Sequence, residues 1–498
     1  MSIVPPPDHE GPRPICSRLS QFAPILLIGG FALTVLLFYP FRFTFELDPD
    51  EGIQLMKALL HAKGSSLYGQ IYSDQPPLFT LLLSGLVQTF GAKVLPARLA
   101  VFGFSLLLLA SAAEHLRRTW GWVHAAAAVV LLALIPAYMQ LSVSVMVGLP
   151  AIALAMLSLL CLTVWHERDR LLWLILAAAL LALSILVKLF TVVLVPAILV
   201  GVLLIPAKNR GPADIRQWSV RWVPAAVWAM VFGVVLGVLA FVLVGPSYMA
   251  QLVETHLGAQ DIDYFAGETL LRHTRDLWPL FALAAIGAGI SIRRGAWSSL
   301  YYAAWIASAG ILLALNRPVW YHQQLLVSAP ASVMAGIGLI ESIRLALERR
   351  SQRWGSIVLA LLSAGLVLLY LYQAGPRFLG KLRLDSPNLA PGAALESREY
   401  ALLTLIEYFD PEGPLLITDR PMFAFRSRRS LPPALANLSQ KVIRSGVVTE
   451  QQMIDMIRER DAPIVLLGRF ALPEVEAYLE TRYDQVYGYV DLRLFVKP

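Results

Sequence analysis

The stretch FELDPDEGIQL, residues 45–55, holds four carboxylates within six positions: Glu46, Asp48, Asp50 and Glu51. It directly follows an apolar run near residues 22–40. A run of about 17–22 apolar residues is long enough to cross the hydrocarbon layer of a membrane. The acids therefore stand just beyond a membrane span, and their density predicts chemistry at the membrane surface.

The composition agrees with an integral membrane protein. The 498 residues are 57% hydrophobic and only 15% charged, and the mean hydropathy is +0.63. The net charge of +7 could suggest a nucleic-acid partner. However, 25 basic and 18 acidic residues precede residue 376, against 16 of each after it. The excess belongs to the membrane part, where basic loops set orientation, so no nucleic-acid partner is expected.

Apolar runs predict about eleven transmembrane helices. They lie near residues 22–40, 98–115, 121–140, 149–165, 171–187, 189–206, 223–245, 278–292, 296–315, 323–341 and 355–373. We expect the first run to be a retained helix that follows a cytoplasmic tail of residues 1–21. This orientation places the basic loops inside, namely those with Arg117/Arg118, Arg168/Arg170, Lys208 to Arg221, Arg293/Arg294 and Arg344 to Arg353.

The apolar run Leu78–Phe90 is 13 residues long, which is short for a span. We interpret it as an interfacial or re-entrant helix within the first external loop, residues 41–97. The transmembrane domain then covers residues 22–374. The 141–148 turn, Lys188, the 246–277 loop and the NRPVWYHQQ segment share the external face with the acids.

Residues 375–498 have balanced charge and ordinary hydropathy. The segments 414–420, 462–468 and 492–496 read as strands, and 449–461 as an amphipathic helix. This predicts a small α/β domain with its own core, which an odd number of spans places outside the cytoplasm.

Pro49 and the helical spacing after it place Asp50 and Glu51 at a helix N-terminus, where the helix dipole favours carboxylates. One reading is a capped interfacial helix with a solvated acidic loop. The other is a carboxylate centre that accepts a proton or holds a divalent cation. Asp50 and His256 are the candidate metal ligands, but the 246–277 loop, with its acids and histidines, matches no established ligand spacing and is more simply a solvated loop.

Three segments together resemble a known family. They are DPDEG (48–52), GSSLYGQIYSDQPPL (64–78) and NRPVWYHQQLLVSAPASVMAGIGL (316–339). Their order and the surrounding helices resemble GT-C glycosyltransferases that use polyprenyl-phosphate sugars, such as protein O-mannosyltransferases and the lipid A aminoarabinose transferase. The resemblance implies a GT-C-type polytopic helical membrane protein with an extracytoplasmic C-terminal domain.

The resemblance also implies roles for particular residues. Asp50 is the leading catalytic acid, with Glu51 beside it, and Glu46 is expected at the surface. Gln75 stands where relatives carry a lysine toward the lipid phosphate, so another cation must meet that phosphate. The candidates for the phosphate and the donor pocket are Lys188, Arg272, Arg317, Tyr321 and His322.

Relatives usually carry a second acid before the span that begins near residue 149, where this chain has Val147 and Gly148. Asp48 or Asp74 is expected to replace it, or the site uses one carboxylate.

The expected function is inverting transfer of a sugar from a polyprenyl-phosphate donor to a hydroxyl of a glycan, lipid or protein, at the external face of the cytoplasmic membrane. A transporter or lipid flippase, or an inactive scaffold, are the alternatives.

Overall fold

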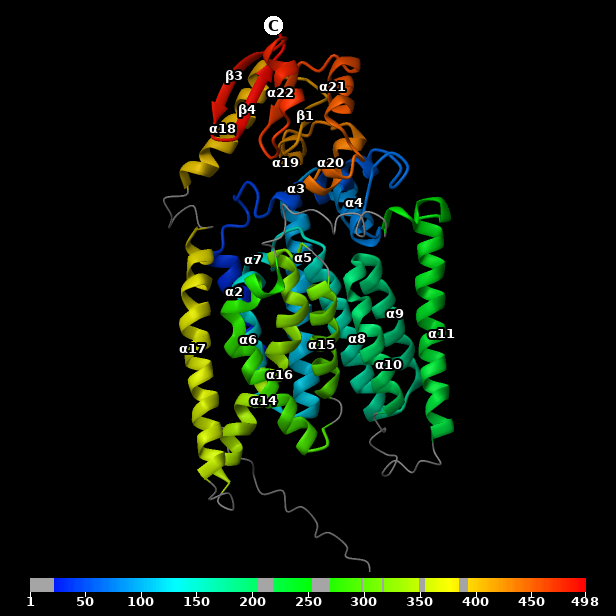
Figure 1. The fold of residues 1–498 in the computed structure, drawn as a ribbon, viewed down its shortest axis with the longest axis vertical. Coiled ribbons are helices and arrows are strands. Elements are labelled where there is room, and N and C mark those ends of the chain that lie inside the picture. The colour runs from blue at the N-terminus through cyan, green and yellow to red at the C-terminus, as the bar shows by residue number, and fades with distance from the viewer. Residues whose placement is uncertain are drawn as a thin grey trace, which may run out of the picture.

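The computed structural model describes residues 22–204, 218–252, 269–296, 299–315, 318–348, 354–384 and 393–498. These residues form a long helical bundle with a small α/β domain at one end (Figure 1). Helices α3 and α4 lie between the bundle and that domain.

The bundle contains helices at every predicted span. They are α2 (Ala23–Phe38), α5 (Val94–Thr119), α6 (Trp122–Ala133), α7 (Pro136–Leu141), α8 (Gly148–Arg168), α9 (Leu171–Val187), η1 (Leu189–Val193), α10 (Leu194–Leu204), α11 (Trp218–Leu243), α14 (Trp278–Arg293), α15 (Leu300–Leu315), η7 (Tyr321–Gln324), α16 (Leu325–Leu347) and α17 (Trp354–Leu384). Short elements η3 (Pro246–Tyr248), α13 (Leu270–Thr274) and η5 (Arg275–Leu277) lie between α11 and α14.

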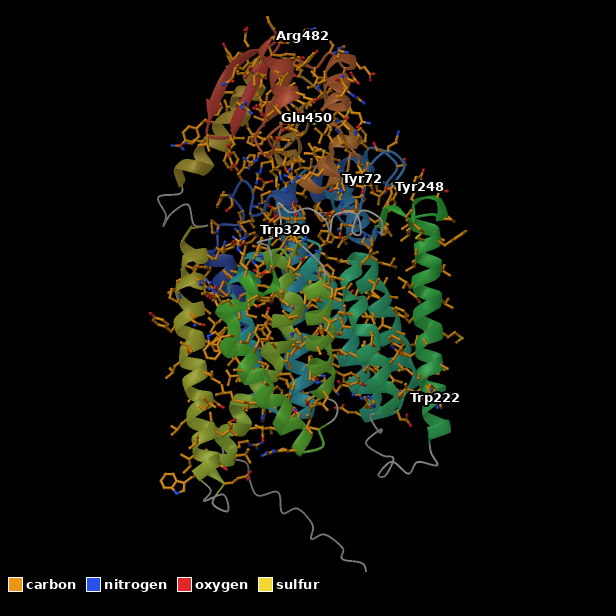
Figure 2. All side chains as sticks on the ribbon, in the orientation of Figure 1. Tyr72, Trp222, Tyr248, Trp320, Glu450 and Arg482 are labelled. Carbon is orange, nitrogen blue, oxygen red and sulfur yellow. The ribbon has the colours of Figure 1, made fainter. Side chains whose placement is uncertain are left out.

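Among the described residues, six helices are long and apolar enough to cross a membrane by length and composition. The other predicted spans correspond to shorter apolar helices. Figure 2 shows Trp222 at one end of α11 and Tyr248 beyond the other. Both side chains are exposed, as expected for aromatic residues at the two membrane interfaces.

Two predicted helices differ in their limits. The expected 121–140 helix ends at Ala133, and a separate helix starts at Pro136. Proline lacks an N–H and disfavours helical backbone in the residue before it, which explains the break. Helix α17 continues past the expected end at residue 373 to Leu384, so it extends beyond the apolar run.

The first external loop contains two helices, α3 (Pro49–Ala62) and α4 (Leu78–Phe90). The bounds of α4 coincide with those of the predicted short helix. The loops that were expected to share its face do meet there. Gln140 Nε2 donates to Leu47 O at 3.0 Å, and Gln251 Nε2 donates to Tyr68 O at 3.2 Å.

The basic loops meet at the opposite end of the bundle. Arg118 Nη1 lies 2.7 Å from Glu167 Oε2, and Arg294 Nη1 lies 2.5 Å from the buried Glu341 Oε2. In the part of the chain that the structure describes, the acidic and basic loops therefore lie at opposite ends of the bundle, as predicted.

The C-terminal domain consists of α18 (Ala393–Phe409), β1 (Ile417–Thr418), α19 (Pro421–Arg426), η8 (Pro433–Leu435), α20 (Gln440–Arg444), α21 (Glu450–Glu459), β2 (Ile464–Leu467), α22 (Pro473–Glu480), β3 (Asp484–Tyr489) and β4 (Leu492–Val496). The sheet order is β1-β2-β4-β3; β1 and β2 are parallel, whereas β4 is antiparallel to both β2 and β3. Strand β3 was not predicted, because its side chains are largely exposed and give no apolar run.

The core of this domain continues into the first loop. One apolar cluster joins its sheet to the first loop, with Phe45, Leu55 and Phe79 packed together with Phe423 and Val465. Gly52 makes the close approach of α3 and α19 feasible, because a Cβ there would lie 2.5 Å from Met422 N. The first loop and the C-terminal domain thus form one layer above the bundle.

Candidate active site

Helix α3 begins at the acidic stretch as the sequence predicts. Asp48 has extended backbone and caps the helix, since its Oδ1 accepts from Asp50 N at 2.8 Å. Pro49 occupies the first helical position, where its missing N–H costs nothing. Asp50 and Glu51 follow in the first turn and point to different surroundings.

Glu51 is fully buried in an ion pair that sequence reasoning missed. Arg98 on α5 donates from Nε to Oε1 at 2.8 Å and from Nη2 to Oε2 at 2.6 Å. The same carboxylate accepts from the backbone of Leu47 and Val145 at 3.0 and 3.1 Å. The contacts with Arg98 and Val145 fix the loop to the bundle, and the contact with Leu47 holds the loop itself. The structure therefore places Glu51 as a structural anchor rather than beside Asp50 as a second catalytic acid.

Glu46 was expected at the surface, and this prediction is wrong. Its side chain is 6% exposed, and Arg420 of the C-terminal domain lies 2.8 Å away. Burial raises the pKa of Glu46 to about 7, although the Arg420 guanidinium opposes this shift. The carboxyl is buried because the C-terminal domain covers the loop.

Asp50 remains partly accessible, with 38% of its side chain exposed. Its Oδ1 accepts from Arg469 Nη2 of the C-terminal domain at 2.6 Å. No described residue donates a hydrogen bond to Oδ2. Asp50 therefore keeps one carboxylate oxygen without a hydrogen-bond donor among the described residues.

Two buried lysines face this group of acids. Lys57 lies two turns after Asp50 on α3, and Lys188 lies at the C-terminal end of α9. Burial lowers the pKa of each lysine to about 8, and the charges of Asp50 and Asp74 act in the opposite direction. The charges of the same two acids, Asp50 and Asp74, therefore act on both ammonium groups.

Lys188 lies beside Gly148, one of the two positions where an acid was expected from relatives. Its Nζ lies 4.0 Å from the position that a Cβ would take at Gly148, and 4.8 Å from the centre of the Phe190 ring. No described residue hydrogen-bonds this ammonium. The space left by the missing side chain at residue 148 is thus next to a cation.

Asp48 lies at the edge of the same site. Its Oδ2 accepts from Tyr321 Oη at 2.5 Å, and that phenol also accepts from Gln140 Nε2 at 3.1 Å. Both Asp48 oxygens are occupied, because Oδ1 caps α3. Tyr321 therefore positions the acidic loop against the bundle, a contact consistent with the predicted pocket role.

Asp74 and Gln75 lie on the loop between α3 and α4. Asn437 Nδ2 of the C-terminal domain donates to Asp74 Oδ1 at 3.2 Å. The backbone oxygen of Gln75 accepts from Tyr68 Oη and Ser73 Oγ at 2.8 and 3.1 Å. Lys57 Nζ reaches Ser73 Oγ at 3.4 Å, which joins this loop to the face of α3 that carries Asp50.

The remaining candidates divide into three groups. His322 is 9% exposed and experiences the charges of both Lys188 and Asp50. Arg272 is exposed on α13, which packs against η7, the element that carries Tyr321 and His322. Arg317 and His256 lie outside the described residues. Among the described residues, no three His, Cys, Asp or Glu side chains group as a metal site would require.

Sequence reasoning missed Lys57, Arg98 and Arg469. Lys57 could have been found, because Asp50, Gln54 and Lys57 follow i, i+4, i+7 spacing and so share a helix face. Arg98 and Arg469 gave no local signal, since they meet their partners across 47 and 419 positions.

Comparison with known proteins shows which families and solved structures this chain is similar to. Residues 74–241 match a family described as dolichyl-phosphate-mannose-protein mannosyltransferase. Among solved structures, ArnT from Cupriavidus metallidurans bound to undecaprenyl phosphate is similar with a TM-score of 0.64 and 15% identity, over 95% of this chain and 98% of that chain. The chain has the GT-C glycosyltransferase fold.

Two further solved structures share the GT-C fold. Archaeal oligosaccharyltransferase AglB from Archaeoglobus fulgidus, in complex with an inhibitory peptide and a dolichol-phosphate, is 13% identical with a TM-score of 0.54, over 92% of this chain and 70% of that one. Arabinofuranosyltransferase AftD from Mycobacteria is 13% identical with a TM-score of 0.50, over 96% of this chain and 41% of that one. A search of curated protein sequences found no match. The fold and the apolar helices identify a multi-pass membrane protein, as predicted.

Proposed function

We propose that this protein is an inverting glycosyltransferase that moves a sugar from a polyprenyl-phosphate donor to an acceptor hydroxyl at the external face of the cytoplasmic membrane. The observation that carries the proposal is the arrangement around Asp50. One carboxylate oxygen is open, and the buried cations Lys57 and Lys188 share its site. Two of the similar structures are complexes with undecaprenyl phosphate and with a dolichol-phosphate, which supports a lipid-linked donor.

The two lysines suit the phosphate of such a donor. The leaving group is a polyprenyl phosphate, whose developing charge needs stabilisation in the transition state. Burial lowers the pKa of Lys188 to about 8, and an incoming phosphate would favour its charged form. Lys188 thereby supplies the positive charge toward the phosphate that Gln75 cannot supply. Lys57 adds a second positive charge from α3.

Asp50 suits the acceptor side. Its open Oδ2 would accept the proton of the acceptor hydroxyl while the oxygen attacks the anomeric carbon. The carbon–phosphate oxygen bond breaks on the opposite side, and the configuration at that carbon inverts. General-base help of this kind contributes roughly 10²–10⁴ in rate.

A divalent cation at Asp50 fits these residues poorly. It would stand against the positive charges of Lys188, Lys57 and Arg469, with Asp48 already occupied by Tyr321 and the α3 cap. The proposed mechanism therefore contains no step at a metal ion.

The decisive experiment uses purified full-length protein and a panel of radiolabelled polyprenyl-phosphate sugars, with release of polyprenyl phosphate as the readout. We expect Asp50→Asn to lower turnover by about 10²-fold or more. The matched control is Asp455→Asn, a change on the exposed face of α21, which should leave turnover unchanged. Parental turnover by the Asp50 variant would refute the proposed base.

The donor side is tested separately with undecaprenyl phosphate itself. Loss of a charge-assisted contact is worth about 1.5–3 kcal/mol, so Lys188→Met should weaken its binding by roughly 10–100-fold. Lys497→Met, at an exposed position near the C-terminus, is the control. If neither the parent nor any variant turns over any donor, and the protein instead moves undecaprenyl phosphate between the leaflets of vesicles, the flippase alternative is favoured.

A further inference from the structure

The loop that follows β2 brings Arg469 of the C-terminal domain into contact with α3, the helix that carries Asp50. Arg469 Nη2 lies 2.6 Å from Asp50 Oδ1, and its Nη1 donates to Pro49 O at 3.2 Å. Its side chain is 19% exposed, so the guanidinium is largely enclosed. A single side chain thus contacts both the backbone and the carboxylate at the start of α3.

The backbone that carries Arg469 is held by a second buried acid. Asp419 is fully buried and accepts three backbone N–H groups: Gly468 on Oδ1 at 2.8 Å, and Arg469 and Phe470 on Oδ2 at 2.8 and 2.9 Å. Three such bonds to one carboxylate fix the conformation of a short loop more firmly than loop contacts with water would.

The sheet explains why these two segments meet. Strands β1 and β2 are parallel, with Thr418 paired to Leu466. Asp419 follows β1 and residues 468–470 follow β2, so both leave the sheet at the same edge. That edge faces α3, which Figure 1 places directly below the C-terminal domain.

Other contacts also hold the C-terminal domain on the first loop. Arg426 donates to the backbone oxygens of Phe45 and Thr44 at 2.6 and 2.8 Å, and Lys63 Nζ donates to Ser430 Oγ at 2.9 Å. Together with the shared apolar core, these contacts hold the C-terminal domain on the first loop at several separate points.

We propose that Arg469 is a positioning residue which the C-terminal domain supplies to the active site, and that Asp419 sets its position. Arg469 binds Oδ1 of Asp50 and leaves Oδ2 directed at the acceptor hydroxyl. The inference rests on the proposed role of Asp50 as the base. It makes the C-terminal domain part of the catalytic apparatus rather than only a module that gathers the acceptor.

The test compares kcat and KM for full-length variants. Arg469→Gln removes both contacts with the start of α3. We expect kcat to fall by about 10-fold while KM for the donor changes by less than about two-fold, because the carboxylate is misdirected but the donor contacts are kept. Arg469→Lys keeps the charge but loses the two-point contact, so it should recover only part of kcat.

Asp419→Asn should displace the loop and lower kcat in the same way as Arg469→Gln. The matched control is Arg482→Gln, far from the site at the outer end of the domain (Figure 2), which should leave kcat and KM unchanged. Thermal unfolding of each variant reports on folding. A loss through KM alone, kinetics identical to the parent, or a gain of activity on removing Arg469 would each overturn the proposal.

The result is separable from the proposed function. An active Asp50→Asn variant refutes the base and the inference together. An inactive Asp50→Asn variant beside an Arg469→Gln variant with parental kcat refutes only the inference.

Discussion

Replacing Glu51 with glutamine tests whether this acid anchors the fold instead of catalysing transfer. The change keeps the shape of the side chain but removes its charge. Arg98 would stay fully buried with no charged partner there, bound to the backbone oxygens of Phe41 and Thr44 at 2.5 and 2.8 Å and to at most one amide oxygen. An unpaired charge would then remain in the core between α5 and the first loop.

The magnitude follows from burial. Both side chains of the pair are 0% exposed, so solvent does not screen the loss. Breaking a buried ion pair by removing one partner costs about 3–5 kcal/mol. Glutamine still accepts a hydrogen bond but also brings N–H groups to a place where Leu47 and Val145 already donate, so the upper half of that range is expected.

The matched control is Glu114→Gln on the same helix as Arg98. Glu114 pairs with Arg117 and Arg118, but its side chain is 32% exposed. Exposed pairs contribute about 0–1 kcal/mol. Thermal unfolding of detergent-solubilised protein should show a drop of about 5 °C or more for Glu51→Gln, and little change for the control.

A double variant separates the charge from the chemistry. Glu51→Leu combined with Arg98→Met removes both charges and should recover much of the stability lost in Glu51→Gln. It should also recover turnover, because neither residue contacts the reacting atoms in the proposed mechanism. A Glu51→Gln protein with parental melting temperature and no turnover would refute this reasoning and return Glu51 to the catalytic candidates.

Three further changes probe the same layer. Gly52→Ala places a Cβ 2.5 Å from Met422 N, so α3 and α19 must separate; we expect a lower melting temperature and lower turnover, whereas Gly85→Ala, where nothing lies within 4 Å, should be neutral. Burial and the charge of Asp50 raise the pKa of Asp48 from its ordinary 3.8 to about 6, so the native state holds a proton that the unfolded state loses in this window. The contribution of Asp48 to stability therefore falls as pH rises through that window, by up to about 3 kcal/mol, and the melting temperature of Asp48→Asn relative to the parent should rise between pH 4 and pH 7; parallel curves would contradict this. Gly148→Asp sets a carboxylate beside Lys188 and should weaken undecaprenyl phosphate binding by roughly 10-fold, whereas equal binding by Gly148→Asp and Gly148→Asn would show that the ammonium does not meet the phosphate.

Most of the fold prediction followed from the length of the apolar runs. Each predicted span coincides with a helix because apolar runs of this length have few other stable solutions in a membrane. The break before Pro136 was readable from the sequence, since proline restricts the residue that precedes it. The extension of α17 was not, because its last turns leave the apolar run and give no membrane signal.

The site was only partly predictable, because it depends on contacts between distant segments. The position of Asp50 at a helix start follows from local sequence. The difference between Asp50 and Glu51 does not, since it depends on which side of α3 meets α5 and which meets the C-terminal domain. Adjacent helical residues point about 100° apart, so two neighbouring acids can have unrelated environments.

This chain has Gly148 where an acid was expected, and this difference changes what the site can bind. The backbone break between α9 and η1 places Lys188 at a helix C-terminus, where the helix dipole favours a cation. Glycine at the start of α8 leaves that cation without a carboxylate directly beside it. With a second acid there, the same lysine would be neutralised within the protein. Without one, the acids that act on its charge among the described residues are Asp50, Asp74 and Asp48. A phosphate can therefore compete for this lysine more easily than for an arginine already held in a bidentate pair, such as Arg98. Under the proposed function, the absence of the expected acid is thus an alternative way to build the donor site.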